Sequence, residues 1–343
     1  MDSPREVLEI LQEDLWTLGR RAYAIRRATY GNVTTFISNM ILNYTNVCVI
    51  ECSFCAFYRP PRMGYLYTVE QAVKKVLEVD TTHGIRQVLI QGGINPEVGI
   101  EYFEELFRQI KAKAPHVAIH ALSPLEVEYL SRRERATYRE ILERLKEAGM
   151  ESMPGGGGEI LVDRVREEIS PKKIDAETWL RIMEEAHKLG VPTSATMMYG
   201  HVETLEDIAT HMYKIAELQK KTGGFMAFIA WNFEPGESEL GKKIPYPKTS
   251  VTLLKMVAAA RVVFKDLIPH IQTGWLTTGP EVAQLAMYFG ADDFGGTLYE
   301  EKVLEWKRAE APVDRRADVV EIIRAAGFVP AERDNLYRVV QSW

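Results

Sequence analysis

Apolar runs rich in β-branched and aromatic residues recur along the chain, and each is followed by a longer amphipathic stretch. Such runs predict β-strands, and stretches with apolar residues at helical spacing predict helices between them. The predicted strands cover residues 34–42, 87–91, 117–122, 151–154, 193–198, 225–231, 270–275 and 292–294. Eight alternations of strand and helix in a chain of this length predict an α/β fold, with a parallel sheet closed into a (β/α)8 TIM-type barrel.

Helix-start signals support this alternation. Thr68 with Gln71, and Thr204 with Asp207, match the capping box, in which two side chains satisfy the first free N–H groups of a helix. Gly190 is expected to end the helix before the fifth strand. These signals place helices where the barrel requires them.

The chain has no long Pro-, Gly- or Ser-rich linker. We therefore expect one barrel over residues 31–305, a helical extension over 1–30 and a C-terminal extension over 306–343 that packs on the barrel. In such a barrel the chemistry lies where strands end and the following loops begin.

Composition and charge narrow the class of protein. The 343 residues are 46% hydrophobic and 26% charged, and no apolar run approaches the roughly 20 residues needed to cross a bilayer. Acidic residues interrupt the N-terminus in a helical pattern, unlike a secretion signal. The net charge of −6 argues against a broad nucleic-acid surface. We expect a cytoplasmic protein with a small-molecule partner, and neither a membrane nor a nucleic acid as partner.

All three cysteines lie in the loop after the first predicted strand, as Cys48, Cys52 and Cys55, with the spacing C-x3-C-x2-C. They are too few and too close for a disulfide framework. Three thiolates can bind three irons of a 4Fe–4S cluster and leave the fourth iron open for the amino and carboxylate groups of S-adenosylmethionine. The alternatives are inert thiols or a structural zinc site with a distant fourth ligand such as His83.

With Phe54 at its aromatic position, the segment 43–59 resembles the signature of the radical S-adenosylmethionine (SAM) superfamily, C-x3-C followed by x-aromatic-C. Residues 153–159, 195–204 and 222–235 resemble the enzymes of the futalosine route to menaquinone. The resemblance covers most of the chain.

Within that group, residues 55–59, 120–124 and 230–235 are most similar to the cyclases of dehypoxanthine futalosine. Aminofutalosine synthases, and the radical enzymes that build the deazaflavin chromophore of coenzyme F420, share the same frame and remain alternatives. A rival of another class is a zinc-stabilised barrel that binds ligands without catalysis.

The resemblance implies a radical SAM oxidoreductase of menaquinone biosynthesis. An external one-electron donor of the flavodoxin or ferredoxin type would reduce the cluster, and a 5′-deoxyadenosyl radical would abstract hydrogen from the ribose-derived ring. The carbon radical would then attack the linked benzoate ring and lose an electron and a proton.

The resemblance also implies which residues meet the cofactor. These are Phe54, Phe57, Tyr58, Gly92, Gly93, Ser123, Glu159, Arg166 and Met198. Several of these residues have a structural alternative. The two glycines would only form a turn, Ser123 would cap the helix that follows, Arg166 would form a surface salt bridge and Met198 would belong to the core.

The substrate is expected to be an aromatic, nucleoside-derived molecule bound near the ends of the later strands, where stacking surfaces and polar groups alternate. The residues expected to bind it are Arg59, His120, Trp231, Gln272 and Trp275. The ring closure needs a general base, and Glu234, Asp293 and His201 are the catalytic candidates.

Overall fold

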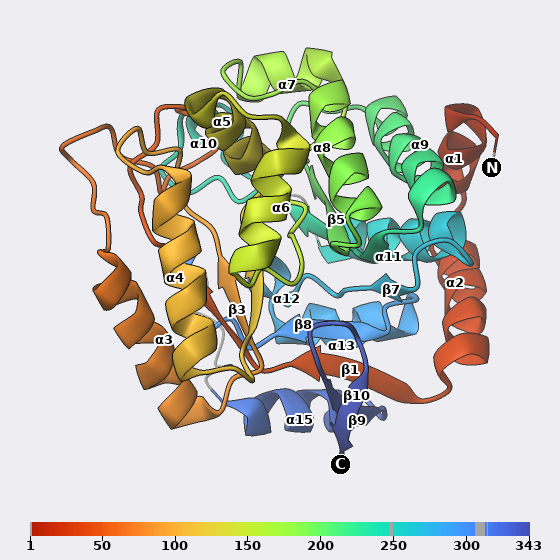
Figure 1. The fold of residues 1–343 in the computed structure, drawn as a ribbon. Helices are drawn as coiled ribbons and strands as arrows, with labels where there is room; N and C mark the ends of the chain where they lie inside the picture. The colour runs from red at the N-terminus through yellow and green to blue at the C-terminus, as the bar shows by residue number, and fades with distance from the viewer. Residues whose placement is uncertain (1, 247–249, 306–312, 314) are drawn as a thin grey trace.

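Parallel strands alternate with helices along most of the chain (Figure 1). The computed structural model describes residues 2–246, 250–305, 313 and 315–343. The strands are β1 (Val33–Ile37), β2 (Asn39–Leu42), β3 (Gln87–Ile90), β4 (Ala118–Ala121), β5 (Thr193–Tyr199), β6 (Phe225–Asn232), β7 (His270–Ile271), β8 (Asp293–Gly296), β9 (Val329–Arg333) and β10 (Val339–Ser342). The expected extension at 306–343 therefore lies partly outside the described residues.

Helices cover the outside of these strands. They are α1 (Pro4–Gln12), α2 (Leu15–Tyr30), α3 (Val69–His83), α4 (Ile100–Lys113), α5 (Pro124–Glu134), α6 (Tyr138–Ala148), α7 (Asp163–Ile169), α8 (Ala176–Lys188), α9 (Leu205–Thr222), α10 (Glu239–Lys243), α11 (Ser250–Phe264), α12 (Trp275–Thr278), α13 (Pro280–Tyr288) and α15 (Arg316–Ala325). The capping boxes predicted at Thr68 and Thr204 are both formed. Among the described helices, none is long and apolar enough to span a bilayer.

The strands close into a TIM-type barrel, as predicted. Strands β2, β3 and β4 pair in parallel, β5, β6 and β7 do the same, and β1 pairs with β8. Isolated parallel bridges join these sheets: Ser152 to His120, Met153 to Thr193, Gln272 to Asp293, and Met40 to Tyr299. The barrel is thus continuous around its wall, although part of it is bridged rather than fully paired.

Three predicted strands differ from the observed ones. The run 34–42 breaks at Ser38 into β1 and β2, and 151–154 contributes only single bridges. The run 270–275 stops after Ile271, because Gly274 adopts a left-handed conformation with φ 65° and Trp275 begins α12. An apolar run alone did not reveal that turn.

The C-terminal strands were not predicted. Strand β9 pairs in parallel with β1, from Val33 opposite Val329 to Phe36 opposite Glu332, and β10 pairs antiparallel with β9 (Figure 1). The pair of β9 with β1 joins segments about three hundred residues apart, so local sequence carries little signal for it. Strand β9 lies beside the first half of the β1–β2 run, while β3 pairs with its second half.

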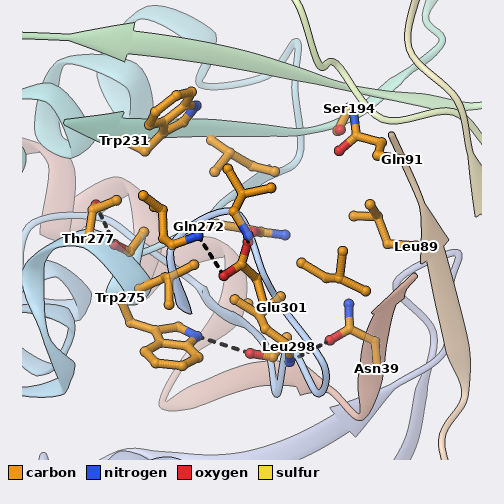
Figure 2. A pocket seen from close by; sticks show the side chains of 18 of the residues that line it. Asn39, Leu89, Gln91, Ser194, Trp231, Gln272, Trp275, Thr277, Leu298 and Glu301 are labelled. Carbon is orange, nitrogen blue, oxygen red and sulfur yellow. Dashed lines mark hydrogen bonds between the residues drawn. The ribbon is translucent and has the colours of Figure 1, made fainter. Parts of the chain in front are cut away.

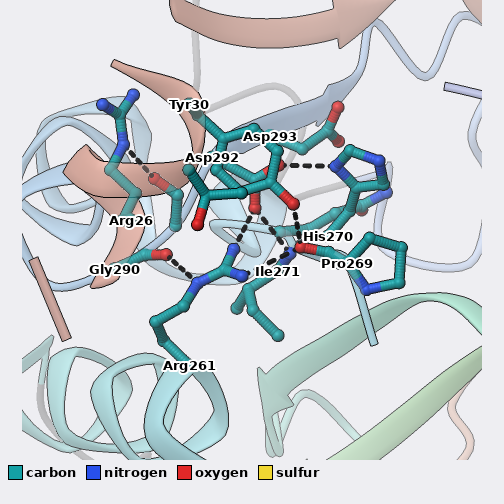
Figure 3. Close-up of polar contacts among 12 residues, drawn as sticks. Arg26, Tyr30, Arg261, Pro269, His270, Ile271, Gly290, Asp292 and Asp293 are labelled. Atoms are coloured by element: carbon teal, nitrogen blue, oxygen red, sulfur yellow. Dashed lines mark hydrogen bonds and ion pairs between the residues drawn. The ribbon is translucent and has the colours of Figure 1, made fainter. Parts of the chain in front are cut away.

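A buried polar network ties α11 to strands β7 and β8 (Figure 3). Arg261 donates to the carbonyls of Gly290 at 2.8 Å and Pro269 at 2.9 Å, and it is ion-paired with Asp292. His270 Nδ1 lies 2.6 Å from the same carboxylate. Although burial opposes ionisation, the bond from His270 and the charge of Arg261 lower the pKa of Asp292. This acid is thus a structural anion in the wall of the barrel.

Candidate functional site

The cysteine loop follows β2 and is held by backbone bonds. The N–H of Cys48 donates to Arg59 O at 3.0 Å, and the N–H of Cys55 donates to Cys52 O at 3.1 Å. The N–H of Ile94, from the loop after β3, donates to the Cys48 sulfur at 3.3 Å. The loop is therefore anchored both to itself and to the neighbouring strand end.

The protein surroundings favour the neutral thiol at Cys52 and at Cys55. Burial raises the pKa of Cys52 to about 12, and burial also raises that of Cys55. Lys173 opposes this shift, while the other cysteines add to it because three thiolates so close together repel one another. A bound cationic group would reverse this balance, since coordinating thiols are deprotonated by the metal.

The donor set fits a cluster. Within the described ranges, no three His, Cys, Asp or Glu side chains converge on one metal position. A 4Fe–4S cluster does not require such convergence, because its three thiolates would each bind a different iron.

A buried ion pair lies beside these thiols. Lys173 Nζ is 2.6 Å from Glu159 Oε1, both side chains are buried, and the ammonium lies 4.9 Å from the centre of the Phe54 ring. Burial by itself would lower the pKa of Lys173. The charges of Cys52 and Glu159, and the hydrogen bond to Glu159, outweigh burial, so the pKa of Lys173 is raised. Lys173 was not among the residues expected from the sequence, because no distinguishing pattern surrounds it.

Glu159 has the form of a cofactor ligand. Its second oxygen, Oε2, is buried and has no hydrogen-bond partner among the described residues. Buried carboxylate oxygens are costly when unpaired, so this atom fits an amino or hydroxyl group of a bound cofactor. The unpaired oxygen is compatible with cofactor binding by Glu159, which stays a prediction.

Arg166, the other charged residue expected at the cofactor, is buried and binds backbone. It donates to the carbonyls of Ile174 at 2.6 and 2.9 Å and of Gly158 at 3.0 Å. Among the described residues, Arg166 forms no salt bridge of the kind considered from sequence, and it is not part of the cavity lining. The guanidinium instead fixes the turn that leads to Glu159.

The two glycines after β3 are required by close packing. A Cβ on Gly92 would lie 2.6 Å from the Tyr44 ring, and one on Gly93 would lie 2.2 Å from Val47 O and 2.7 Å from Cys48 Cβ. This is the close backbone approach for which glycine is suited. The loop is pressed against the cysteine segment, and cofactor contact by the glycines stays a prediction.

Ser123 forms the capping box of α5, the alternative left open by the sequence. Its hydroxyl donates to Glu126 Oε2 at 2.8 Å, and its N–H donates to the same oxygen at 2.7 Å. The other oxygen, Glu126 Oε1, accepts from Tyr44 OH at 3.0 Å and from Gly92 N at 3.3 Å. Glu126, which the sequence analysis missed, thus joins the loops after β2, β3 and β4.

A cavity of about 380 Å³ opens inside the barrel beside the cysteine loop. Eight residues expected at the site line it: Phe54, Cys55, His120, Met198, Trp231, Glu234, Gln272 and Trp275. Figure 2 shows Trp231 and Trp275 on one side, with Asn39, Leu89 and Gln91 on the other. The volume and the mixture of aromatic and polar groups suit a small-molecule ligand.

The expected residues Phe57, Tyr58 and Arg59 lie outside this cavity lining. Arg59 is exposed, and its guanidinium donates to the carbonyls of Ala56 and Tyr58 in its own loop, at 3.0 and 2.8 Å. The Phe57 ring packs edge-on against Tyr65. These side chains stabilise the cysteine loop, and their contact with ligands stays a prediction.

The three candidate bases have different surroundings. Glu234 lines the cavity and accepts a bond from the Asn232 amide. His201 is buried, with Nε2 3.1 Å from Met198 O and Nδ1 3.3 Å from Glu203. Asp293 is buried and engaged by other residues, and neither it nor His201 lines the cavity. The geometry favours Glu234.

The C-terminal segment also reaches the cavity. Arg333, Asn335 and Tyr337, from β9 and the turn after it, are lining residues that sequence reasoning missed. Arg333 binds Asp293, and Gln272 Nε2 donates to Tyr337 OH at 2.9 Å. Because these contacts depend on the pairing of β9 with β1, local sequence had no signal for them.

Comparison with known proteins identifies the family. Residues 42–214 match the model of the Radical SAM superfamily, and residues 222–342 match the CofH/MqnC C-terminal region. Cyclic dehypoxanthine futalosine synthase of Streptomyces coelicolor is 39% identical, over 98% of this chain and 84% of that protein. Aminodeoxyfutalosine synthase of Thermus thermophilus is 38% identical, over 96% of this chain and 90% of that protein.

A third relative is named for another activity. The 5-amino-6-(D-ribitylamino)uracil–L-tyrosine 4-hydroxyphenyl transferase of Methanococcoides burtonii is 38% identical, over 98% of this chain and 95% of that protein. Among solved structures, methylornithine synthase has a TM-score of 0.76 at 17% identity, covering 96% of this chain and 94% of its own, which supports the fold. The chain therefore belongs to the radical SAM superfamily, within the family that has the CofH/MqnC C-terminal region, and its cofactors are a 4Fe–4S cluster and S-adenosylmethionine.

Proposed function

We propose that this enzyme is a radical SAM cyclase, which converts dehypoxanthine futalosine to cyclic dehypoxanthine futalosine in menaquinone biosynthesis. The observation that carries the proposal is that Cys55 of the cysteine loop and the carboxylate-bearing Glu234 line one cavity. Ring closure on a benzoate needs both a radical source and a base at the same substrate, and this cavity offers a place for both.

The cofactors are held by residues of the strand ends. Cys48, Cys52 and Cys55 would bind the cluster, and Glu159 with its unpaired oxygen would bind a polar group of S-adenosylmethionine. When bound, these groups supply a 5′-deoxyadenosyl radical that abstracts hydrogen from carbon. Lys173 would balance the negative charge that the thiolates and Glu159 place in this buried region.

The chain's own contribution is to position the substrate and take a proton. Trp231 and Trp275 offer aromatic faces to the benzoate ring, and apolar neighbours such as Leu89 limit the access of water. Glu234 accepts the proton that leaves the ring when its aromaticity is restored, and the electron lost in the same step would pass to the oxidised form of the external one-electron carrier. The donated hydrogen bond from Asn232 holds that carboxylate in one orientation.

The remaining expectations concern the cell. We expect the enzyme to work in the cytoplasm with an external one-electron donor of the flavodoxin or ferredoxin type. These expectations rest on the soluble composition of the chain and on the need of the cofactors for an electron.

The test is anaerobic reconstitution with iron and sulfide, followed by dithionite, S-adenosylmethionine and dehypoxanthine futalosine. A cyclase gives substrate-dependent 5′-deoxyadenosine and a product lighter than its substrate by two hydrogens, both read by mass spectrometry. An adenosyl group retained in the product would indicate aminofutalosine synthase instead. Turnover of 5-amino-6-(D-ribitylamino)uracil with tyrosine would indicate the transferase activity of the third relative.

A further inference from the structure

Asn335 lies in the barrel interior, at the far end from the cysteine loop. It follows β9, is 4% exposed and lines the cavity. It is bonded to Gln87, the first residue of β3, whereas the cysteine loop follows the last residue of β2. Asn335 is therefore placed where the deep end of a bound substrate would lie.

Three carboxamides form a row across this end, which we call the amide row: Asn39, Gln87 and Asn335. The N–H of Leu298 donates to Asn39 Oδ1 at 3.0 Å, a link that Figure 2 shows. Asn39 Nδ2 then donates to Gln87 Oε1 at 3.0 Å, and Gln87 Nε2 donates to Asn335 Oδ1 at 2.6 Å.

The direction of the amide row is set by the backbone. A peptide N–H can only donate, so Leu298 requires an oxygen at its end of the row, and each amide then donates to the next. Asn335 consequently ends the row with its NH2 group directed away from Gln87. That nitrogen is buried and has no partner within the part of the chain that the structure describes. An unpaired donor of this kind points to a ligand.

His120 supplies an acceptor next to it. The Ser152 hydroxyl donates its one hydrogen to Asn335 Oδ1 at 3.0 Å, so His120 Nδ1, 2.6 Å from the same hydroxyl, must be the protonated nitrogen of a neutral ring. Burial, with a smaller contribution from Arg333, lowers the pKa of His120 to about 3, which keeps the ring neutral. The other nitrogen, Nε2, then carries a lone pair, and His120 lines the cavity.

The charges around the deep end of the cavity disfavour a negatively charged ligand group there. Of the described lining residues, Arg333 alone is a cation, and its Nε and Nη2 are bound to Asp293 at 2.6 and 3.1 Å. A substrate carboxylate placed here would be buried beside a pair that is already neutral. The donor and the acceptor together suit an uncharged group that can both accept and donate, which is a hydroxyl.

We propose that Asn335 and His120 bind a hydroxyl of the substrate's sugar or polyol part, with Asn335 donating to it and His120 accepting from it. Asn335 is then a specificity-determining residue supplied by the C-terminal segment. For the identity of the substrate this inference rests on the proposed function. It directs a hydroxyl of the ribose-derived ring toward the deep part of the cavity and leaves the opposite side of that ring facing the cysteine loop, where the hydrogen would be abstracted.

The decisive variant is Asn335→Asp, which keeps the oxygen that accepts from Gln87 and replaces the unpaired donor with an oxygen. The matched control is Asn32→Asp, because Asn32 is a half-buried residue outside the cavity lining whose amide donates to Gly327 O at 2.8 Å, ahead of β9. We expect Asn335→Asp to raise the KM for dehypoxanthine futalosine by about tenfold or more, and the control to leave it unchanged. Substrate-independent cleavage of S-adenosylmethionine should be the same in all three proteins, which shows that the barrel and cofactor site are intact.

A second variant, Asn335→Ala, removes the donor without adding a buried charge. An analogue of the substrate that lacks one ring hydroxyl should bind the wild-type protein about tenfold more weakly than the parent compound. For Asn335→Ala this difference should vanish for the hydroxyl that Asn335 binds. An unchanged KM in both Asn335 variants, or a loss that is equal for every analogue, would overturn the inference.

The outcome separates this inference from the proposed function. Turnover of 5-amino-6-(D-ribitylamino)uracil in place of dehypoxanthine futalosine would end the cyclase proposal, and the ribityl hydroxyls would then replace the ring hydroxyls in the same comparison. Turnover of an enolpyruvyl benzoate, which has no sugar of its own, with a KM unaffected by Asn335→Asp would reject the hydroxyl site itself.

Discussion

Arg333 of β9 and Asp293 of β8 form a buried ion pair, with Nε to Oδ2 at 2.6 Å and Nη2 to Oδ1 at 3.1 Å. Thr35 of β1 donates to the same carboxylate at 2.6 Å. The pair therefore links the C-terminal strand to two strands of the barrel wall. The pair also argues against Asp293 as the catalytic base, because its carboxylate is already bound to the Arg333 guanidinium.

Removing one partner of this pair should be costly. Arg333→Met leaves Asp293 buried and uncompensated, and we expect the free energy of unfolding to fall by about 3–5 kcal/mol. Asp293→Asn with Arg333→Met removes both charges, so the double variant should be more stable than Arg333→Met alone. Urea unfolding of the four proteins measures the coupling, and additive losses would show that the pair has no special role.

Glu234 should be needed for turnover but not for the radical chemistry. Glu234→Gln removes the base, and we expect product formation to fall by about 10²–10⁴-fold while the stability of the protein is little changed. Glu237→Gln is the matched control, since Glu237 is exposed and only three residues further along. Product is followed by mass spectrometry, and full activity of Glu234→Gln would return attention to His201 or Asp293.

Two helices of equal length allow the role of Glu126 to be isolated. Both α5 and α6 have 11 residues and a capping box, formed by Ser123 with Glu126 and by Thr137 with Glu140. Glu140→Ala should cost about 1 kcal/mol, the value of an exposed cap. Glu126→Ala also leaves buried donors from Tyr44 and Gly92 unpaired, so we expect about 2–4 kcal/mol.

The same pair of variants tests the cysteine loop. Reconstituted Glu126→Ala should hold less iron than the wild type, because the loop after β3 that donates to Cys48 is no longer tied to Glu126. Glu140→Ala should retain the full iron content. Equal iron in both variants would limit Glu126 to a helix cap.

Glu126 should also give stability a characteristic dependence on pH. Burial raises its pKa from the ordinary value of 4.5 to about 7, although Ser123, Tyr44 and Gly92 oppose the shift. The folded state therefore binds more protons than the unfolded state between about pH 4.5 and 7, and stability falls as pH rises through this range. The loss is on the order of 3 kcal/mol, from 1.36 kcal/mol per pKa unit. Urea midpoints of Glu126→Gln compared with wild type across this range should show a smaller slope for the variant.

Much of the barrel could be read from local pattern. Seven of the eight predicted apolar runs overlap the observed strands β1–β8, because a strand buried on both faces must be apolar and a helix start needs a cap. The run before Trp275 was assigned too long, since Gly274 turns the chain there. Strand β9 was missed because its partner β1 lies at the other end of the chain, and β10 was missed with it because β10 pairs only with β9.

Part of the candidate site could also be predicted from the sequence. The spacing of Cys48, Cys52 and Cys55 within one loop indicated iron–sulfur chemistry, because ligands close in sequence must be close in space. Residues near strand ends, such as Trp231 and Glu234, were found because a barrel gathers its strand ends at one face.

Other parts of the site were decided by tertiary structure alone. Lys173 meets Glu159 across 14 positions, Glu126 meets Tyr44 across 82, and Asn335 meets Gln87 across 248. Hydrogen bonds and ion pairs act over a few ångströms, so such partners are chosen by the path of the backbone and not by their neighbours in sequence. Local sequence was enough for the class of chemistry and for the barrel that holds it, while the pairing of β9 with β1 brought the polar groups of the C-terminal segment into the cavity lining.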